Sequence, residues 1–106
     1  MEEQLVIVAY KPKPGKEEAL HLLMREHYSI LKQQDLVTDR TPVMMQAKDG
    51  TVIEVFGWKS KAAIESAHTN AAVLKMWAEY NEACDYVPIA TIVEALNLFS
   101  SFAPFV

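Results

Sequence analysis

Apolar residues follow two periodicities along the chain, and together these predict alternating strands and helices. Residues 4–11 and 51–58 are nearly continuous in apolar side chains, which is typical of strands covered on both faces. Residues 16–34 carry apolar positions at helical spacing, and a second helical stripe covers residues 71–84. We therefore expect two central strands and two amphipathic helices.

Turn-forming residues separate these elements. Two prolines and a glycine within residues 11–15 end the first strand, because proline cannot continue the hydrogen-bond ladder. Residues 42–48 precede Asp49-Gly50, a dipeptide that predicts a tight type I′ hairpin to the following strand. This second strand contains a proline and a lysine and is expected at the edge of the sheet.

The remaining pattern completes an α+β fold. Ser60 is placed to cap a short helix that reaches His68, and residues 86–94 predict a fourth strand with an irregularity at Pro88. The resulting order, βαββαβ, is that of a ferredoxin-like domain with an antiparallel sheet.

The chain is expected to form a single domain over residues 1–106, since no repeat or linker divides it. Both helices of such a domain pack on one face of the sheet, so strands that are apolar on both faces need a second cover. We expect a homodimer that pairs the two sheets. The apolar C-terminal tail, residues 97–106, is expected to pack on the domain or on its partner. The alternative is a monomer whose tail covers its own sheet.

Composition narrows the classes of function. The net charge is −4 and about half of the residues are apolar, which disfavours electrostatic binding to nucleic acid or anionic membranes. The single cysteine, Cys84, excludes an internal disulfide and suits a reducing compartment. The chain shows neither a signal-peptide pattern nor an apolar run long enough to span a bilayer. A cytoplasmic protein is expected.

Three polar residues are candidates for chemistry. Glu54 interrupts the third strand, where a buried carboxylate needs a partner; the alternatives are an ion pair with Arg40 or a position facing water. His27 lies on the apolar stripe of the first long helix, where it can meet Glu54 or be a satisfied core histidine. His68 ends the short helix, and its imidazole can accept a proton from a phenol; a structural helix-end histidine is the alternative.

Aromatic residues complete the expected site. A pocket for a planar ligand would be lined by aromatic side chains that also suit a plain core. The candidates are Tyr10, Tyr28, Trp58, Trp77 and Tyr80. The two candidate histidines and the carboxylate match the ligand set of non-haem iron, but their dispersed spacing carries no metal signature, so no metal site is expected.

Several of these features resemble the antibiotic-biosynthesis-monooxygenase-like (ABM) family of dimeric α/β barrel proteins. The similar features are the order of elements, the Lys-Pro-Gly turn at residues 13–15 and the run WKSKAAIESAHTNAAVLKMW that begins at Trp58. Within that run, Trp58-Lys59-Ser60 and Ala67-His68 match positions of relatives. The resemblance extends to about Leu96. It implies ferredoxin-like subunits whose two sheets form a barrel, each with a pocket between sheet and helices.

The resemblance also implies a class of activity, because several relatives oxidise aromatic or quinol substrates without metal or flavin. The expectation is a cofactor-independent monooxygenase acting on a small aromatic or quinol-type compound, with His68 as the base and Glu54 and His27 as its orienting or proton-relay partners. A non-catalytic dimeric module that binds a small ligand or stabilises an assembly is the alternative.

A haem-degrading branch of the same family is similar in outline. That branch relies on an asparagine in the first strand and on a tryptophan and a histidine in the second helical region. This chain has Val8, Ala67 and Trp77 at those places. The resemblance therefore does not imply haem degradation, and no cofactor is expected.

Overall fold

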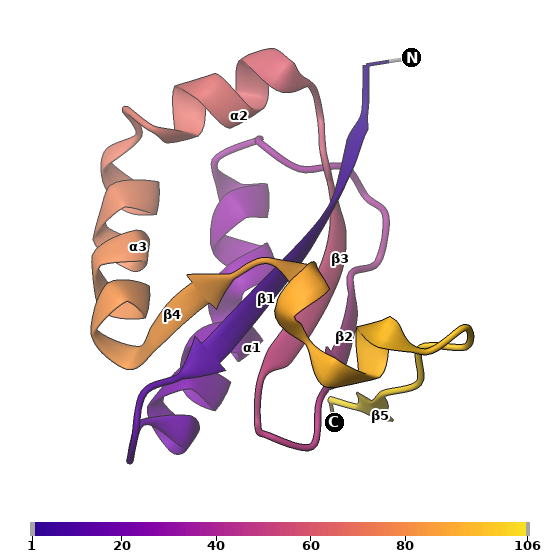
Figure 1. The fold of residues 1–106 in the computed structure, drawn as a ribbon. Coiled ribbons are helices and arrows are strands. Elements are labelled where there is room, and N and C mark those ends of the chain that lie inside the picture. Colours follow the sequence, from indigo (N-terminus) through magenta and orange to yellow (C-terminus); the bar gives the residue numbers. More distant parts are fainter. Residues whose placement is uncertain (1, 106) are drawn as a thin grey trace.

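The computed structural model describes residues 2–105 as one α+β unit, with three helices and an open five-stranded antiparallel sheet (Figure 1). The strand order is β4-β1-β3-β2-β5, and the helices lie together on one face of the sheet (Figure 1). None of these helices is long and apolar enough to cross a bilayer. The elements are β1 (Gln4–Pro12), α1 (Glu17–Gln33), β2 (Val43–Gln46), β3 (Val52–Trp58), α2 (Lys61–Ala67), α3 (Ala71–Ala83), β4 (Cys84–Val87), the 3₁₀ turns η1 (Ile89–Thr91) and η2 (Val93–Leu96), and β5 (Ala103–Pro104).

β1 and β3 form the centre of the sheet, as their apolar runs predict. They pair in antiparallel register with Val8 opposite Glu54, and residues alternate between the helix side and the outer face. Six of the seven β3 residues are buried, so the prediction that this strand is covered on both faces is confirmed. In β1 the outer-face residues Leu5 and Ile7 are each 56% exposed in the single chain, so the expected cover of this face by a second copy stays a prediction.

The turn between β2 and β3 differs from the predicted type I′ hairpin. Only Gly50 has a positive φ, of 93°, whereas a type I′ turn needs positive φ at both central residues. The Gly50 amide donates to the Ala47 carbonyl at 3.0 Å, and the Ala47 amide donates to the Thr51 carbonyl at 2.8 Å. The loop is therefore one residue longer, and Gly50 takes the left-handed position that follows a type I turn.

The fourth strand is shorter than predicted. β4 covers Cys84–Val87 and stops at Pro88, which has no amide proton to continue the ladder with β1. The chain then turns onto the outer face as two 3₁₀ turns, where Ile92 packs with Ala9 and Ile53. Only part of the outer face is covered in this way.

The C-terminal tail makes β2 an inner strand, which corrects its predicted position at the sheet edge. β5 pairs with β2, with Ala103 opposite Gln46, and Phe105 packs against the core beneath the helices. The apolar tail packs against the domain, and its β5 strand forms the hydrogen bonds that the free edge of β2 would otherwise lack. Val106 lies outside the described residues.

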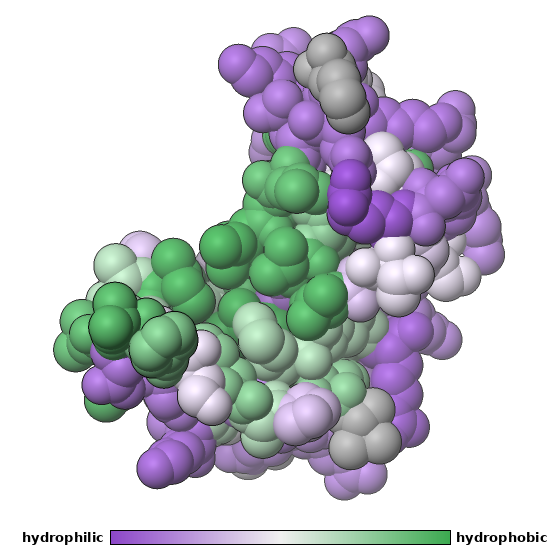
Figure 2. All heavy atoms as spheres, turned by 90° about the vertical axis from the view of Figure 1, so that its right-hand side faces the viewer, coloured by the Kyte–Doolittle hydropathy of each residue, from purple (hydrophilic) through white to green (hydrophobic). Residues whose placement is uncertain are grey.

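A broad apolar surface remains on the outer side of the sheet. Figure 2 shows apolar side chains gathered over the sheet and the C-terminal segment, in a hollow beside a protruding lobe. The strand register places the exposed side chains of Leu5, Ile7 and Val43 on this outer face. The segment after β4 also exposes large apolar side chains, namely Val93, Leu96, Leu98 and Phe99. A contiguous patch of this kind is typical of an interaction surface.

The positive φ at Gly50 gives a direct test of the turn. A Cβ there would meet only Pro12 Cγ, at an ordinary 3.5 Å, so the cost of Gly50→Ala is backbone strain. We expect Gly50→Ala to lower the free energy of unfolding by about 1–2 kcal/mol in urea denaturation. Gly50→Asn is the matched control, since asparagine tolerates the left-handed region, and it should cost less. Equal costs would contradict the assigned turn.

Candidate functional site

A cleft of about 380 Å³ lies between the sheet and the helices α2 and α3. We call it the aromatic cleft, because five aromatic side chains and an imidazole form much of its wall. The lining residues are Val6, Val8, Tyr10, His27, Phe56, Trp58, Ile64, Trp77, Asn81 and Tyr86. None of these is a lysine, arginine, aspartate or glutamate, so an uncharged planar molecule suits this cleft better than an anion.

A buried carboxylate lies behind this wall. The strand alternation of β3 places Glu54 on the helix side, where its side chain is 0% exposed. Tyr10 in β1 donates its hydroxyl to Glu54 Oε1 at 2.7 Å, and His27 Nδ1 in α1 lies 3.0 Å from the same oxygen. Three elements therefore meet in one polar group, which we call the Tyr10–Glu54–His27 cluster.

The surroundings of the cluster are apolar and aromatic. The His27 ring lies edge-on to Phe56 and Tyr80, with ring centroids 5.3 and 5.6 Å apart. Burial, and then the negative charge of Glu54, raises the pKa of Tyr10 well above its usual value. Tyr10 therefore remains a hydroxyl donor throughout the physiological pH range.

This geometry gives His27 a defined orientation. A carboxylate oxygen accepts hydrogen bonds, so the Nδ1 that faces Glu54 is placed to donate its proton. Nε2 is then the nitrogen that can take a proton, and His27 is itself part of the cleft wall. A histidine held by a carboxylate on one nitrogen is the arrangement of a general base with its orienting partner.

The structure brings together some of the predicted wall residues. Tyr10, Trp58 and Trp77 line the aromatic cleft. Tyr80 lies behind the wall, fully buried, with its ring centroid 5.4 Å from that of Tyr10. Tyr28 lies elsewhere and donates its hydroxyl to the Thr38 carbonyl at 2.7 Å. Tyr28 and Tyr80 are therefore not part of this cleft wall, and their expected role in ligand binding stays a prediction.

His68 lies apart from the other two candidates. It is the exposed C-cap of α2, its ring centroid is 5.2 Å from that of Trp77, and it is not part of the cleft wall. Its expected role as base stays a prediction. Glu54 does not form the ion pair with Arg40 that was its structural alternative. The Arg40 guanidinium donates to Glu3 instead, at 2.9 and 3.0 Å.

Several wall residues were not predicted, although the sequence carries signals for two of them. Phe56 lies two positions after Glu54, and strand alternation places both on the same face. Asn81 follows Trp77 by four residues on α3, which places it on the same helix face. Tyr86 lies opposite Tyr10 in the β1–β4 register, and that register could not be read from the sequence.

No cluster of three His, Cys, Asp or Glu side chains within residues 2–105 could hold a metal ion. His27 and Glu54 are in contact, but His68 lies apart from both of them. Cys84 is buried at the start of β4, and burial raises its thiol pKa to about 11, which makes it a weak nucleophile at neutral pH.

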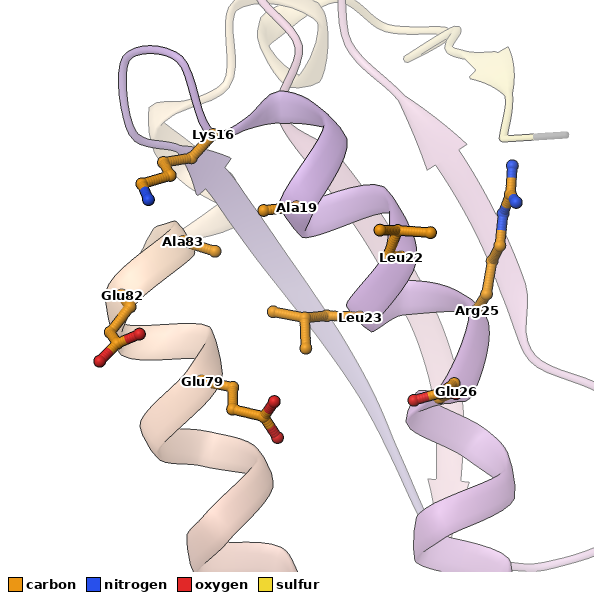
Figure 3. A pocket seen from close by; sticks show the side chains of 9 residues that line it. All are labelled: Lys16, Ala19, Leu22, Leu23, Arg25, Glu26, Glu79, Glu82 and Ala83. Atoms are coloured by element: carbon orange, nitrogen blue, oxygen red, sulfur yellow. The ribbon is translucent and has the colours of Figure 1, made fainter.

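A second hollow, of about 530 Å³, lies between α1 and α3 (Figure 3). Its apolar floor contains Leu22 and Leu23, and Glu26 and Glu79 extend into it from facing helices (Figure 3). These carboxylates have no partner of opposite charge within residues 2–105. The hollow contains none of the predicted site residues and no buried ionisable group, so the aromatic cleft is the stronger candidate site.

The hydrogen bonds of Glu54 predict its contribution to stability. Glu54→Leu would leave the Tyr10 hydroxyl and the His27 ring without their buried acceptor. We expect it to lower the free energy of unfolding by about 2–3 kcal/mol in denaturant titrations. Glu79→Leu, on the exposed face of α3, is the matched control and should change it by about 0.5 kcal/mol or less. An unchanged stability for Glu54→Leu would show that the cluster is not formed.

Comparisons of the chain with models of protein families, with curated proteins and with solved structures find no match. The aromatic cleft and the Tyr10–Glu54–His27 cluster behind it are therefore the structural features on which a function can be based.

Proposed function

We propose that the protein is a cofactor-independent monooxygenase-like enzyme that binds a small aromatic or quinol-type compound in the aromatic cleft. One observation carries the proposal: the fully buried Glu54 is held by Tyr10 and His27, and both of these partners line the cleft. A buried carboxylate is costly unless it is hydrogen-bonded, and a buried carboxylate whose partners line a cleft is a candidate site residue.

The cleft fits such a ligand in size and chemistry. Its volume lies at the lower end of the range for small-molecule sites, which suits a molecule of one or two fused rings. Trp58 and Trp77 offer flat faces for stacking, and Asn81 adds a neutral hydrogen-bonding group. The lining has no fixed charge to hold a carboxylate or phosphate, so neutral phenols and quinols are favoured.

His27 is the best-placed base for this chemistry. Its Nε2 would take the proton of a ring hydroxyl, while Glu54 holds Nδ1–H and stabilises the imidazolium that forms. The resulting anion is electron-rich enough to reduce dioxygen. For a hydroquinone, one oxygen atom would enter the ring to give a hydroxyquinone, and the other would leave as water with two substrate hydrogens.

The same proposal includes a ferredoxin-like subunit and a homodimer of the α/β barrel type. The strand order β4-β1-β3-β2, with all helices on one face, supports the first part. The uncovered apolar outer face supports the second, because a second copy of the same sheet would bury it (Figure 2). The exposed apolar segment after β4, which includes Leu98, would then lie against the partner.

Replacing His27 tests the proposed base. With a panel of naphthohydroquinones and phenols, we expect the wild-type protein to consume oxygen and His27→Ala to lose about 100-fold or more in kcat/KM. Ligand binding, followed by quenching of tryptophan fluorescence, should be retained. Loss of binding and turnover together would instead indicate a structural role for His27.

His68→Ala separates the two candidate bases in the same assay. If His68 were the base, this variant would show the large loss and His27→Ala would not. Glu54→Gln, which weakens the hold on His27, should also lower kcat/KM, whereas Glu79→Gln is the matched control and should leave it unchanged, since Glu79 lies outside the aromatic cleft. Tight binding without turnover in the wild type would favour the non-catalytic ligand-binding alternative.

The dimer is tested by charging the outer face. Ile7→Glu places a carboxylate on the apolar outer face of β1 and is expected to convert a dimer into a monomer in light-scattering measurements of mass. Leu22→Glu is the matched control, because Leu22 is 58% exposed on α1, on the opposite side of the sheet, and it should leave the mass unchanged. A monomeric wild type would contradict the proposal.

A further inference from the structure

The short β4 leaves part of β1 without a neighbour. β4 pairs with β1 only from Ala9 to Pro12, so the stretch from Gln4 to Val8 is paired on the β3 side alone. In Figure 1 this open edge lies above β4, beside the region that α2 and α3 enclose. A central strand of the sheet is thus also an edge strand over half its length.

The register shows which backbone groups point to this open edge. The Lys13 amide donates to the Ala83 carbonyl at 2.9 Å, so odd-numbered residues of β1 direct their N–H and C=O groups toward the β4 side. Leu5 and Ile7 therefore direct four main-chain groups to the open edge. No hydrogen bond to these groups is formed within residues 2–105.

Natural edge strands are usually protected by charges, prolines or bulges. The sequence Leu-Val-Ile-Val at residues 5–8 has none of these, and it is rich in β-branched residues that favour pairing. The inward side chains of this stretch, Val6 and Val8, also form part of the aromatic cleft wall. A strand added here would lie along the mouth of the cleft.

We propose that the open edge of β1 is a strand-addition site for an extended peptide that places an aromatic side chain into the aromatic cleft. Main-chain hydrogen bonds to Leu5 and Ile7 provide the affinity for the peptide, and the cleft determines which inward-pointing side chain it accepts. Because the cleft wall is aromatic and has no fixed charge, the selected residue is aromatic and uncharged. All strand pairs in this sheet are antiparallel, so we expect the peptide to run antiparallel to β1.

The register of the bound peptide follows from the same alternation. A peptide residue opposite Val6 points inward and directs its own backbone away from β1. The residues before and after it lie opposite Ile7 and Leu5, and their N–H groups face β1. The peptide would share the cleft with the proposed aromatic substrate, but its recognition does not depend on turnover.

Selective methylation of peptide nitrogens tests this register on the full chain. The probe is acetyl-Lys-Thr-Val-Phe-Val-Thr-Lys-amide, in which the phenylalanine is the inward residue. Methylating the two valine nitrogens removes the donors that face β1, whereas methylating the phenylalanine nitrogen removes a donor that faces solvent. Calorimetric titration should show that the first change weakens binding about 10-fold or more and that the second changes it about 2-fold or less.

Replacing the peptide phenylalanine with alanine should also weaken binding about 10-fold, since the cleft is then left unfilled. Equal affinities for all of these peptides, or no binding of the parent peptide at about 1 mM, would overturn the proposal. Pairing of two protein copies through the same edge would also overturn the proposal. Light scattering would then give the mass of a dimer, and adding the peptide would not lower it. The peptide titration measures binding and not oxygen consumption. Its result can therefore be interpreted even if the proposed enzyme activity is not found.

Discussion

The hydrogen bonds of Glu54 are the constraint on which the rest of this structure depends. A carboxylate with no exposed surface must receive its hydrogen bonds from the protein, because water cannot reach it. Tyr10 and His27 supply them from β1 and α1, so the strand pairing and the placement of the first helix are fixed by the same group. An apolar residue at position 54 would impose no such requirement. The cluster thus links the packing of the core to the chemistry at its edge.

The second determinant is the early end of β4. Because Pro88 stops this strand after four residues, the sheet does not close over the space beneath α2 and α3. The aromatic cleft is open for this reason, and the same gap leaves Leu5 and Ile7 with unpaired main-chain groups. The segment that follows is redirected to the outer face, where it covers Ala9 and Ile53 but not the rest of β1. One proline therefore shapes the cleft, the open edge and the outer face.

Much of the fold could be predicted from the sequence, because local signals and burial agree there. The spacing of apolar residues predicts both the buried β3 strand and the inward position of His27. The residue type at Ser60 predicts a helix cap, and its hydroxyl accepts a hydrogen bond from the Ala63 amide at 3.0 Å. The long fourth strand and the type I′ turn were wrong. Pro88 ended the strand where its apolar neighbours supported a longer one, and the turn closed one residue later, with positive φ at Gly50 but not at Asp49.

The site was predictable only in part. The meeting of Glu54 with His27 follows from two elements that face one interior, whereas the contribution of Tyr10 as a hydrogen-bond donor depends on strand register, which the sequence does not specify. His68 was attractive because it ends a helix within the stretch that resembles the ABM family. Its position beyond Trp77 depends on the angle between α2 and α3, which no local signal encodes.

The most direct test of this account is nitrogen-15 NMR of the histidine side chains in the intact protein. We expect the His27 Nδ1 proton to exchange slowly with water, because it is buried against Glu54, and the His27 Nε2 signal to shift when a naphthohydroquinone is added. A rapidly exchanging Nδ1 proton, with no response of Nε2 to the ligand, would contradict the claim that a buried carboxylate orients this histidine toward the cleft.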